Sequence, residues 1–280
     1  MNIGITGATG FIGSHLIRRL QSEGHTTRAI SLRTPPGPSG LIGCDAVVHL
    51  AGEPVAQRWT TPAKQRIFES RERGTRALVE AMRPDPPIVM VSASAVGYYG
   101  SRAGEVLTEQ AEPGNDFLAG VCVAWERKAT EAEKLGVRVA IPRIGMVLGV
   151  GGGALAQMLT PFRLGVGGRI GSGKQWMAWI HIDDLCGLIS FALRDRSVKG
   201  PLNAVSPNPV TNAEFTKALA GALHRPAVFP IPAFALKLLF GEMSEVLLAS
   251  QRAIPEAPLA AGFRFQHEDI GEALKHVLTA

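Results

Sequence analysis

The segment Asn2-Ile-Gly-Ile-Thr-Gly7-Ala-Thr-Gly10-Phe-Ile-Gly13 decides the fold. Its first residues, 2–6, predict a buried strand, and the amphipathic stretch 11–23 predicts a helix directly after the glycines. Because the glycines have no side chains, the backbone N–H groups of the turn can approach a pyrophosphate, and the positive end of the helix dipole attracts its negative charge. The alternative is that the glycines serve only a tight turn. We predict a dinucleotide site formed by Gly7, Thr9, Gly10, Phe11, Ile12 and Gly13.

The alternation of strands and helices continues through the first 145 residues. Further strands are predicted at 26–31, 45–50, 87–92 and 137–142, and further helices at 62–82 and 116–134. This order is typical of a doubly wound parallel sheet. Between the second and third strands, the stretch 35–43 is rich in proline and glycine, so we expect a short loop there instead of a full helix.

The pattern changes after Arg143. A glycine-rich loop with a short helix precedes a strand at 179–181, a helix capped by Asp183 or Asp184, and a strand near 202–205. Further helices are expected after Thr211, within 232–239, at 241–250 and at 267–278. The predicted fold is α/β, a Rossmann-type doubly wound parallel sheet with a small, mainly helical C-terminal lobe. Residues 1–145 form the predicted dinucleotide-binding core, to which 181–205 return, and residues 146–180 and 206–280 form a substrate-side lobe.

Composition excludes several classes of protein. The 280 residues are 46% hydrophobic, which suits a packed core, and the net charge of +5 is scattered, so we expect no nucleic-acid partner. The uncharged stretch 144–162 is broken by glycines and Pro161, and nothing at the N-terminus resembles a signal peptide, so we expect no membrane partner. The three cysteines are far apart, which predicts no disulfide framework and a reducing, cytoplasmic compartment. No His, Cys or carboxylate group has metal-ligand spacing, so no metal site is expected.

Cofactor choice depends on the end of the second strand. Proteins that bind NAD place an acidic side chain there, about 20 residues after the glycines, on the ribose hydroxyls. Here no Asp or Glu lies between Glu23 and Asp45, and Ser31 and Arg33 stand at that position. An arginine can pair with a 2′-phosphate through charge-assisted hydrogen bonds, although Arg33 could also be an ordinary exposed loop residue. We therefore predict NADP(H) as the cofactor.

The third and fourth predicted strands end in Asp45-Ala-Val-Val-His-Leu-Ala-Gly52 and Val91-Ser-Ala-Ser-Ala-Val-Gly-Tyr-Tyr-Gly100. With the glycine turn, these segments resemble the extended short-chain dehydrogenase/reductases, the superfamily of nucleotide-sugar epimerases. Trp125-Glu126, Pro142-Arg-Ile-Gly145 and other segments along the whole chain narrow the resemblance to its "epimerase family protein" branch, sometimes labelled cell-division inhibitor-like. The resemblance allows a homodimer through the helices at 62–82 and 116–134.

The resemblance also implies further cofactor contacts. These are Leu50, Ala51 and Gly52 near the adenosine, Arg71 on the helix at 62–82, and Ser92, Pro142 and Arg143 toward the nicotinamide. In one respect the chain departs from the family. The family tends to place its second-strand arginine where Leu32 stands, one residue before Arg33, and a one-residue shift turns a side chain to the other face of a strand.

The usual catalytic pair of the superfamily is missing. Its members use a tyrosine as general acid/base and a lysine four residues later on the same helix face. The chain has only Tyr98 and Tyr99, and neither is followed by a lysine at that spacing. Alignment on Glu126 places Leu118 and Cys122 at the two positions.

Other residues remain as candidates for catalysis. Ser94 occupies the place of the hydroxyl that polarises a carbonyl, or it serves only to satisfy backbone groups at the strand end. Tyr98 and Tyr99 could supply a phenol or could be packing residues. Cys122 lacks an activating base, which favours an inert thiol, and His181 is interpreted as structural.

Two functional hypotheses follow. The first is an NADP-dependent oxidoreductase or epimerase that acts on an unknown small-molecule substrate with a carbonyl or sugar-like group. The second is a non-catalytic NADP(H)-binding sensor or interaction protein, favoured by the missing tyrosine and lysine.

Overall fold

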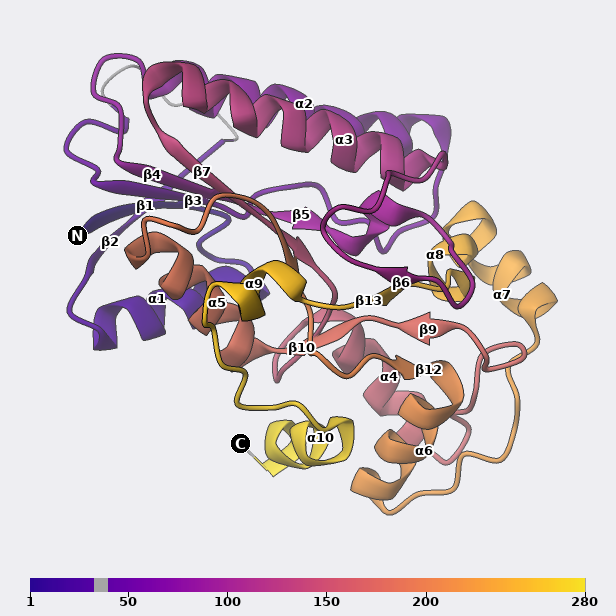
Figure 1. The fold of residues 1–280 in the computed structure, drawn as a ribbon. Helices are drawn as coiled ribbons and strands as arrows, with labels where there is room; N and C mark the ends of the chain where they lie inside the picture. The colour runs from indigo at the N-terminus through magenta and orange to yellow at the C-terminus, as the bar shows by residue number, and fades with distance from the viewer. Residues whose placement is uncertain (33–39, 280) are drawn as a thin grey trace.

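A parallel sheet forms the centre of the structure, a computed structural model that describes residues 1–32 and 40–279 (Figure 1). Its strands follow the order β2-β1-β3-β4-β7-β11, and the short β5 adds to β7. Every pairing in this sheet is parallel. The strands are β1 (Asn2–Thr6), β2 (Thr26–Ile30), β3 (Ala46–His49), β4 (Val89–Ser92), β5 (Ser94–Ala95), β7 (Arg138–Ile144) and β11 (Gly200–Ala204).

Helices cover both faces of this sheet (Figure 1). On one face, α1 (Phe11–Ser22) and α5 (Ile182–Arg194) bury Leu16 and Ile189 against the strands. On the other, α2 (Thr61–Ala81) and α3 (Phe117–Thr130) contribute to a second apolar cluster. The doubly wound α/β fold predicted from the sequence is therefore confirmed. Because β2 and β3 flank β1, the strand order reverses there, and ligands of such sheets bind outside the carboxyl ends of the strands at this point.

The connection from β2 to β3 contains no helix among the residues that the structure describes, as its prolines and glycines predict. Two short elements follow β5, η1 (Val96–Tyr99) and β6 (Val106–Leu107), and β6 pairs with β13 (Arg252–Ala253) near the C-terminal end of the chain. A further short helix, η2 (Glu131–Leu135), connects α3 to β7.

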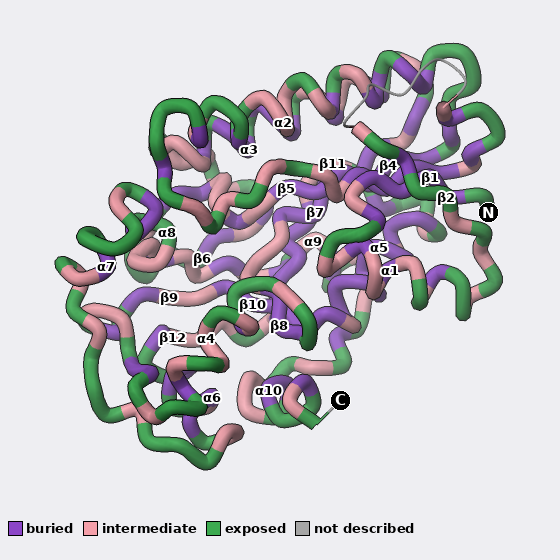
Figure 2. Tube along the Cα trace, turned by 180° about the vertical axis from the view of Figure 1, so that it is seen from behind, coloured by how far each residue is buried: buried purple, intermediate pink, exposed green. Residues whose placement is uncertain are grey.

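The C-terminal lobe has its own apolar core around Trp179, Phe215 and Leu274. It is mainly helical, as predicted, whereas the division into residue ranges stays a prediction. Its elements are β8 (Met146–Leu148), α4 (Gly153–Arg163), β9 (Trp176–Met177), β10 (Trp179–His181), β12 (Val210–Thr211), α6 (Asn212–Leu223), α7 (Ala233–Phe240), η3 (Gly241–Met243), α8 (Ser244–Leu248), β13 (Arg252–Ala253), α9 (Glu256–Ala260) and α10 (Ile270–Thr279). Figure 2 shows the buried strands of the central sheet between α2 and α3 on one side and the lobe on the other.

One helix start differs from the prediction. The N-cap of α5 is His181, whose Nδ1 accepts the backbone N–H of Asp183 at 3.1 Å, and not Asp183 or Asp184. Asp183 lies in the first turn, while the buried Asp184 carboxylate accepts the backbone N–H groups of Gln266 and His267. The prediction failed because a histidine at this position can accept the same hydrogen bond as an aspartate.

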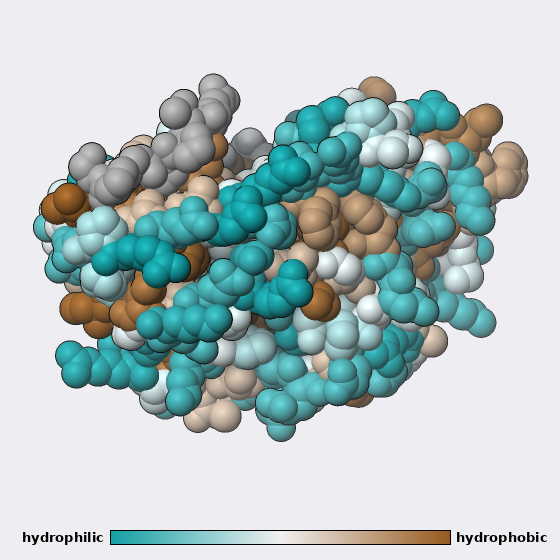
Figure 3. All heavy atoms as spheres, turned by 90° about the horizontal axis from the view of Figure 1, so that it is seen from above, coloured by the Kyte–Doolittle hydropathy of each residue, from teal (hydrophilic) through white to brown (hydrophobic). Residues whose placement is uncertain are grey.

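The outer side of α2 and α3 is mostly hydrophilic, with hydrophobic residues between the polar ones (Figure 3). Phe68 and Val123 are exposed on these helices, and the homodimer through them stays a prediction. None of the helices in the described parts of the chain is both long and apolar enough to cross a membrane. Cys44, Cys122 and Cys186 are buried free thiols.

Candidate functional site

The glycine turn between β1 and α1 has the geometry of a phosphate cradle. Gly7 has a φ of +69°, and a Cβ on Gly13 would lie 2.2 Å from the Gly7 carbonyl oxygen, so both positions require glycine. Gly10 differs, because its Cβ would meet only that carbonyl oxygen, at 3.1 Å. Gly10 is the N-cap of α1 and has no side chain to satisfy the first N–H groups of the helix. These donors therefore suit an anion such as a pyrophosphate.

A cleft of about 920 Å³ opens beside this turn. The ends of β1, β2 and β3 form one wall, and one face of α2 forms the other. The lining residues are those at 7–10, 29–32 and 50–53, with Arg66, Glu69, Ser70, Arg73, Gly74 and Ala77 of α2. Of the predicted cofactor residues, Gly7, Thr9, Gly10, Ser31, Leu50, Ala51 and Gly52 lie in this lining.

The cleft contains two cationic side chains that the sequence reasoning missed, Arg66 and Arg73. They share a helix face with Glu69, Ser70 and Ala77, at spacings of three and four residues that could have marked the face in the sequence. Ser31 and Leu32 line the opposite wall at the end of β2. Arg33, the residue predicted to bind a 2′-phosphate, lies outside the described residues.

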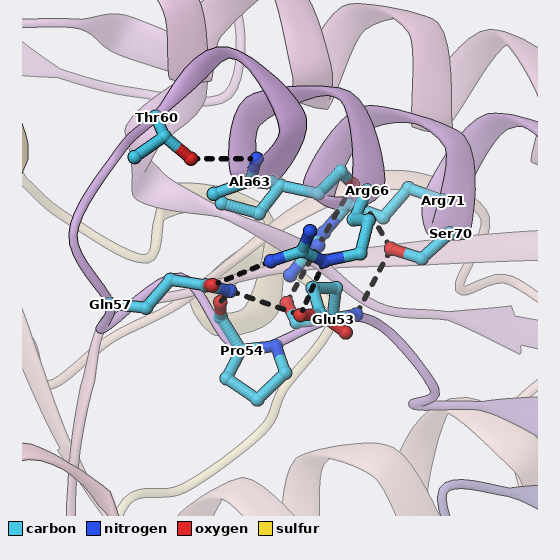
Figure 4. A network of polar contacts seen from close by, with 9 residues as sticks. Glu53, Pro54, Gln57, Thr60, Ala63, Arg66, Ser70 and Arg71 are labelled. Carbon is cyan, nitrogen blue, oxygen red and sulfur yellow. Dashed lines mark hydrogen bonds and ion pairs between the residues drawn. The ribbon is translucent and has the colours of Figure 1, made fainter.

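The adenosine-side segment 50–53 is held from behind by polar contacts (Figure 4). Arg71 Nη1 donates to the carbonyl oxygen of Glu53 at 3.0 Å, and the Glu53 backbone N–H donates to Ser70 Oγ at 3.0 Å. A Cβ on Gly52 would lie 3.1 Å from the Arg71 guanidinium carbon, so the glycine allows this close approach. Burial lowers the pKa of Arg71. Arg71 thus positions the cleft wall, and a direct contact with the cofactor stays a prediction.

A buried histidine joins β1, β3 and α2 below the cleft. His49 contacts Thr6 Oγ1 at 2.7 Å through Nδ1 and Thr75 Oγ1 at 2.9 Å through Nε2. Thr6 Oγ1 also accepts the backbone N–H groups of Leu50 and Ala51. Burial lowers the pKa of His49 to about 3, with a further contribution from the charge of Arg71, so the ring is neutral.

A second polar cluster surrounds the position of the missing catalytic pair. Ser94 Oγ donates to Glu126 Oε1 at 2.6 Å, and Arg143 binds both Glu126 oxygens at 2.9 Å. Arg143 is almost completely buried. Burial lowers its pKa, but the hydrogen bonds and the charge of Glu126 raise it by more, so the pKa of Arg143 lies above its ordinary value. Arg143 also donates to the carbonyl oxygen of Glu109. The guanidinium of Arg143 therefore binds groups of the protein itself, and its predicted contact with the nicotinamide is untested.

The two tyrosines occupy different environments. Tyr99 is fully buried, where its hydroxyl donates to Asn203 Oδ1 at 2.6 Å and accepts from Arg143 Nη1 at 3.0 Å. Burial raises its pKa to about 12. Tyr98 is only partly buried, and its ring lies 3.4 Å from the Arg143 guanidinium carbon. Burial raises the Tyr98 pKa as well, so its phenol is protonated near neutral pH.

Leu118 and Cys122 stand on α3 beside these tyrosines. A Cβ on Gly97 would lie 3.4 Å from Leu118 Cβ and 3.9 Å from Cys122 Sγ. Burial raises the pKa of Cys122 to about 11, so the thiol stays protonated. Neither residue can provide the phenol and the cation of the usual pair. The Ser92 hydroxyl, at the end of β4, is buried without a hydrogen-bond partner among the described residues.

The sequence profile of the NAD-dependent epimerase/dehydratase family matches residues 3–204. The chain belongs to this family. A domain of unknown function, DUF1731, matches residues 231–277, within the C-terminal lobe. These matches confirm the resemblance inferred from the sequence motifs.

Relatives of this family are similar over the whole chain. The "Epimerase family protein SDR39U1 homolog, chloroplastic" of Arabidopsis thaliana is 40% identical over 302 residues, which cover 99% of this chain and 87% of the plant protein. The crystal structure of human epimerase family protein SDR39U1 (isoform 2) with NADPH has a TM-score of 0.91 at 36% identity, with 100% and 99% of the two chains covered. A nucleoside-diphosphate sugar epimerase of Corynebacterium glutamicum has a TM-score of 0.83 at 37% identity, with 99% of this chain and 58% of that chain covered.

Three histidines and an aspartate from separate segments of the chain also meet in space. His181, Asp183, His267 and His276 bring potential metal-ligand atoms within 4.8 Å of one another. Their spacing along the chain predicts no such group, because His267 and His276 follow His181 by more than eighty residues. Only the tertiary fold brings them together.

Proposed function

We propose that the protein binds NADP(H) in the cleft and catalyses oxidation or reduction of a small carbonyl or sugar-like substrate. The observation that carries the proposal is the N-terminus of α1 at Gly10, which has no side-chain cap and opens on a cleft lined by Arg66 and Arg73. The sequence has no Asp or Glu between Glu23 and Asp45, so no carboxylate follows β2 to bind the ribose hydroxyls. The crystal structure of human SDR39U1, which is 36% identical to this chain, is a structure with NADPH, and this supports the same cofactor here.

The residues of the chain fit this cofactor in distinct ways. Backbone donors after Gly10 would bind the pyrophosphate, and residues 50–53 would hold the adenosine side. Arg73 carries its guanidinium on the cleft face of α2, paired with Glu69 at 3.0 Å, and would bind the 2′-phosphate together with or in place of Arg33. When bound, the nicotinamide supplies or accepts the hydride.

Proton transfer falls to Tyr98 in this proposal. A carbonyl that receives a hydride becomes an alkoxide and needs a proton donor. Tyr98 is partly accessible and holds its proton, whereas the Tyr99 hydroxyl already bonds to Asn203 and Arg143. Ser94 would position the substrate oxygen once its hydroxyl proton, which Glu126 now accepts, turns to that oxygen.

A screen of carbonyl and sugar substrates that follows NADPH absorbance tests the proposal. With a true substrate, Tyr98→Phe and Ser94→Ala should each lower kcat by at least about tenfold, because a positioned acid contributes about 10²–10⁴-fold. Tyr99→Phe is the matched control and should mainly lower stability. Full activity of both the Tyr98 and the Ser94 variants would exclude this assignment. With UDP-glucose we expect negligible turnover, because Leu118 and Cys122 replace the usual pair.

A non-catalytic NADP(H)-binding sensor is the second candidate. It is favoured by the Ser94 hydroxyl, whose proton is directed at Glu126 and not at the cleft, and by the protonated Cys122 thiol. This function predicts no turnover in the screen and a protein partner whose capture depends on NADPH.

A further inference from the structure

The cluster of His181, Asp183, His267 and His276 lies apart from the cofactor cleft, since none of the four lines it. Three segments contribute. His181 ends β10, and Asp183 lies in the first turn of α5. His267 lies in the connection before α10, and His276 is on α10 itself. In Figure 1, α10 is the last helix of the chain, and Figure 2 shows that it has both a buried and an exposed side.

Buried contacts fix the His181 side chain and the backbone at His267. His181 is fully buried at the start of α5. The buried Asp184 carboxylate accepts the backbone N–H groups of Gln266 and His267 at 2.8 and 2.9 Å, which holds His267 against the first turn of α5. The ring centroids of His181 and His267 are 3.8 Å apart, and those of His267 and His276 are 4.6 Å apart.

One pair of ring nitrogens has nearly the separation that two ligands of one metal ion require. His181 Nε2 and His276 Nδ1 are 3.1 Å apart. Two imidazole nitrogens at about 2.0–2.1 Å from a tetrahedral zinc ion lie roughly 3.3 Å from each other. Because His181 Nδ1 accepts the Asp183 backbone N–H, the neutral ring carries its proton on Nε2, between the two rings.

We propose that His181, His267 and His276 bind a divalent transition-metal ion of the zinc type, with Asp183 orienting His181. The metal takes the place of the proton between His181 and His276, and the proton of the His181 ring moves to Nδ1. There it faces Asp183 Oδ2, now 3.6 Å away, in the carboxylate–histidine–metal arrangement that is common in proteins. This exchange gives up the N-cap hydrogen bond from the Asp183 N–H.

The ring of His267 is stacked on that of His181, so the nitrogen lone pairs of the two rings do not point to a common metal position. The His267 ring therefore has to rotate when the metal binds. Partial exposure of His267 and the exposed position of His276 leave room for this rotation. Imidazole ligands select zinc and its neighbours over magnesium or calcium, which prefer oxygen. The fourth coordination position is left to water, and the metal would fasten α10 to the start of α5.

The test uses the full chain, purified without a polyhistidine tag and treated with a chelator. Zinc chloride is titrated by competition with a chromophoric chelator, and cobalt(II) is added in a parallel sample to record visible absorption bands. We expect one metal per chain, tetrahedral cobalt bands, and a melting temperature that rises with zinc. Wild-type protein that binds no zinc at micromolar free concentration would overturn the proposal.

Variants locate the site. His267→Ala and His276→Ala should each weaken zinc binding by at least about tenfold and abolish the zinc-dependent rise in melting temperature, and Asp183→Asn should weaken it by about 10–100-fold. The matched control is His224→Asn, an exposed histidine with a φ of +53° that asparagine tolerates, and it should bind zinc like the wild type. Both alanine positions are at least partly exposed, so a folded variant is expected, and circular dichroism checks it. Unchanged zinc affinity in both alanine variants would contradict the assignment.

Discussion

Replacement of Glu126 by glutamine should strongly destabilise the protein. The side chains of Arg143 and Glu126 are only 3% and 10% exposed, and Arg143 makes two bonds of 2.9 Å to the carboxylate. Glu126→Gln keeps the size of the side chain but leaves the Arg143 charge buried without a counter-ion. Breaking a buried pair in this way costs about 3–5 kcal/mol, a large part of the roughly 5–15 kcal/mol that stabilises a typical domain.

Urea unfolding, followed by circular dichroism, measures this loss as a lower midpoint at unchanged slope. The matched control is Glu131→Gln, whose carboxylate pairs with Lys128 at 2.8 Å but is 37% exposed. Such surface pairs contribute about 0–1 kcal/mol, so the control should unfold near the wild type. The double variant Glu126→Gln/Arg143→Met should recover part of the loss. If Glu126→Gln and Glu131→Gln have the same small effect, the buried pair does not hold this region together.

Three further predictions concern the cleft and its supports. His49 keeps a folded pKa of about 3 against an unfolded value near 6.5, so the unfolded state takes up the proton first. The free energy of unfolding should therefore be constant above pH 6.5 and fall toward pH 3, by up to about 1.4 kcal/mol per pH unit, and His49→Gln should flatten this slope in urea titrations. Gly10→Val should lose NADPH binding while the protein stays folded, because a Cβ on Gly10 would meet only the Gly7 carbonyl oxygen, at 3.1 Å, and Gly10 lines the cleft. Gly13→Ala should instead lower the melting temperature, since its Cβ would lie 2.2 Å from the Gly7 oxygen; equal melting of the two variants would contradict this reading.

Much of the fold follows from local sequence patterns. The strand predicted at 2–6 and the helix at 11–23 agree with β1 and α1 to within a residue, because periodicity and the glycine turn act locally. The cap of α5 was assigned wrongly, since aspartates next to His181 offer the more usual signal. The short strands β9 and β12 pair only with each other, and each has two residues. Two residues are too few to form an alternating pattern that would predict a strand.

The candidate site was less predictable where its contacts are long-range. Tyr98 and Tyr99 are adjacent and equivalent in sequence, yet only Tyr99 reaches Asn203 on β11, more than a hundred residues away. The link from Ser94 to Glu126 and Arg143 likewise joins three separate elements. Such contacts depend on how the sheet and α3 pack, which no local pattern encodes.

The central claim is that the cleft binds NADP(H) in preference to NAD(H), and isothermal titration calorimetry of the full chain with NADPH and NADH tests it directly. Because a charge-assisted contact to the 2′-phosphate contributes roughly 1.5–3 kcal/mol, NADPH should bind at least about tenfold more tightly than NADH. Arg33→Ala and Arg73→Ala show which arginine makes this contact, by weakening NADPH and sparing NADH. Equal or tighter binding of NADH by the wild-type protein would contradict the account.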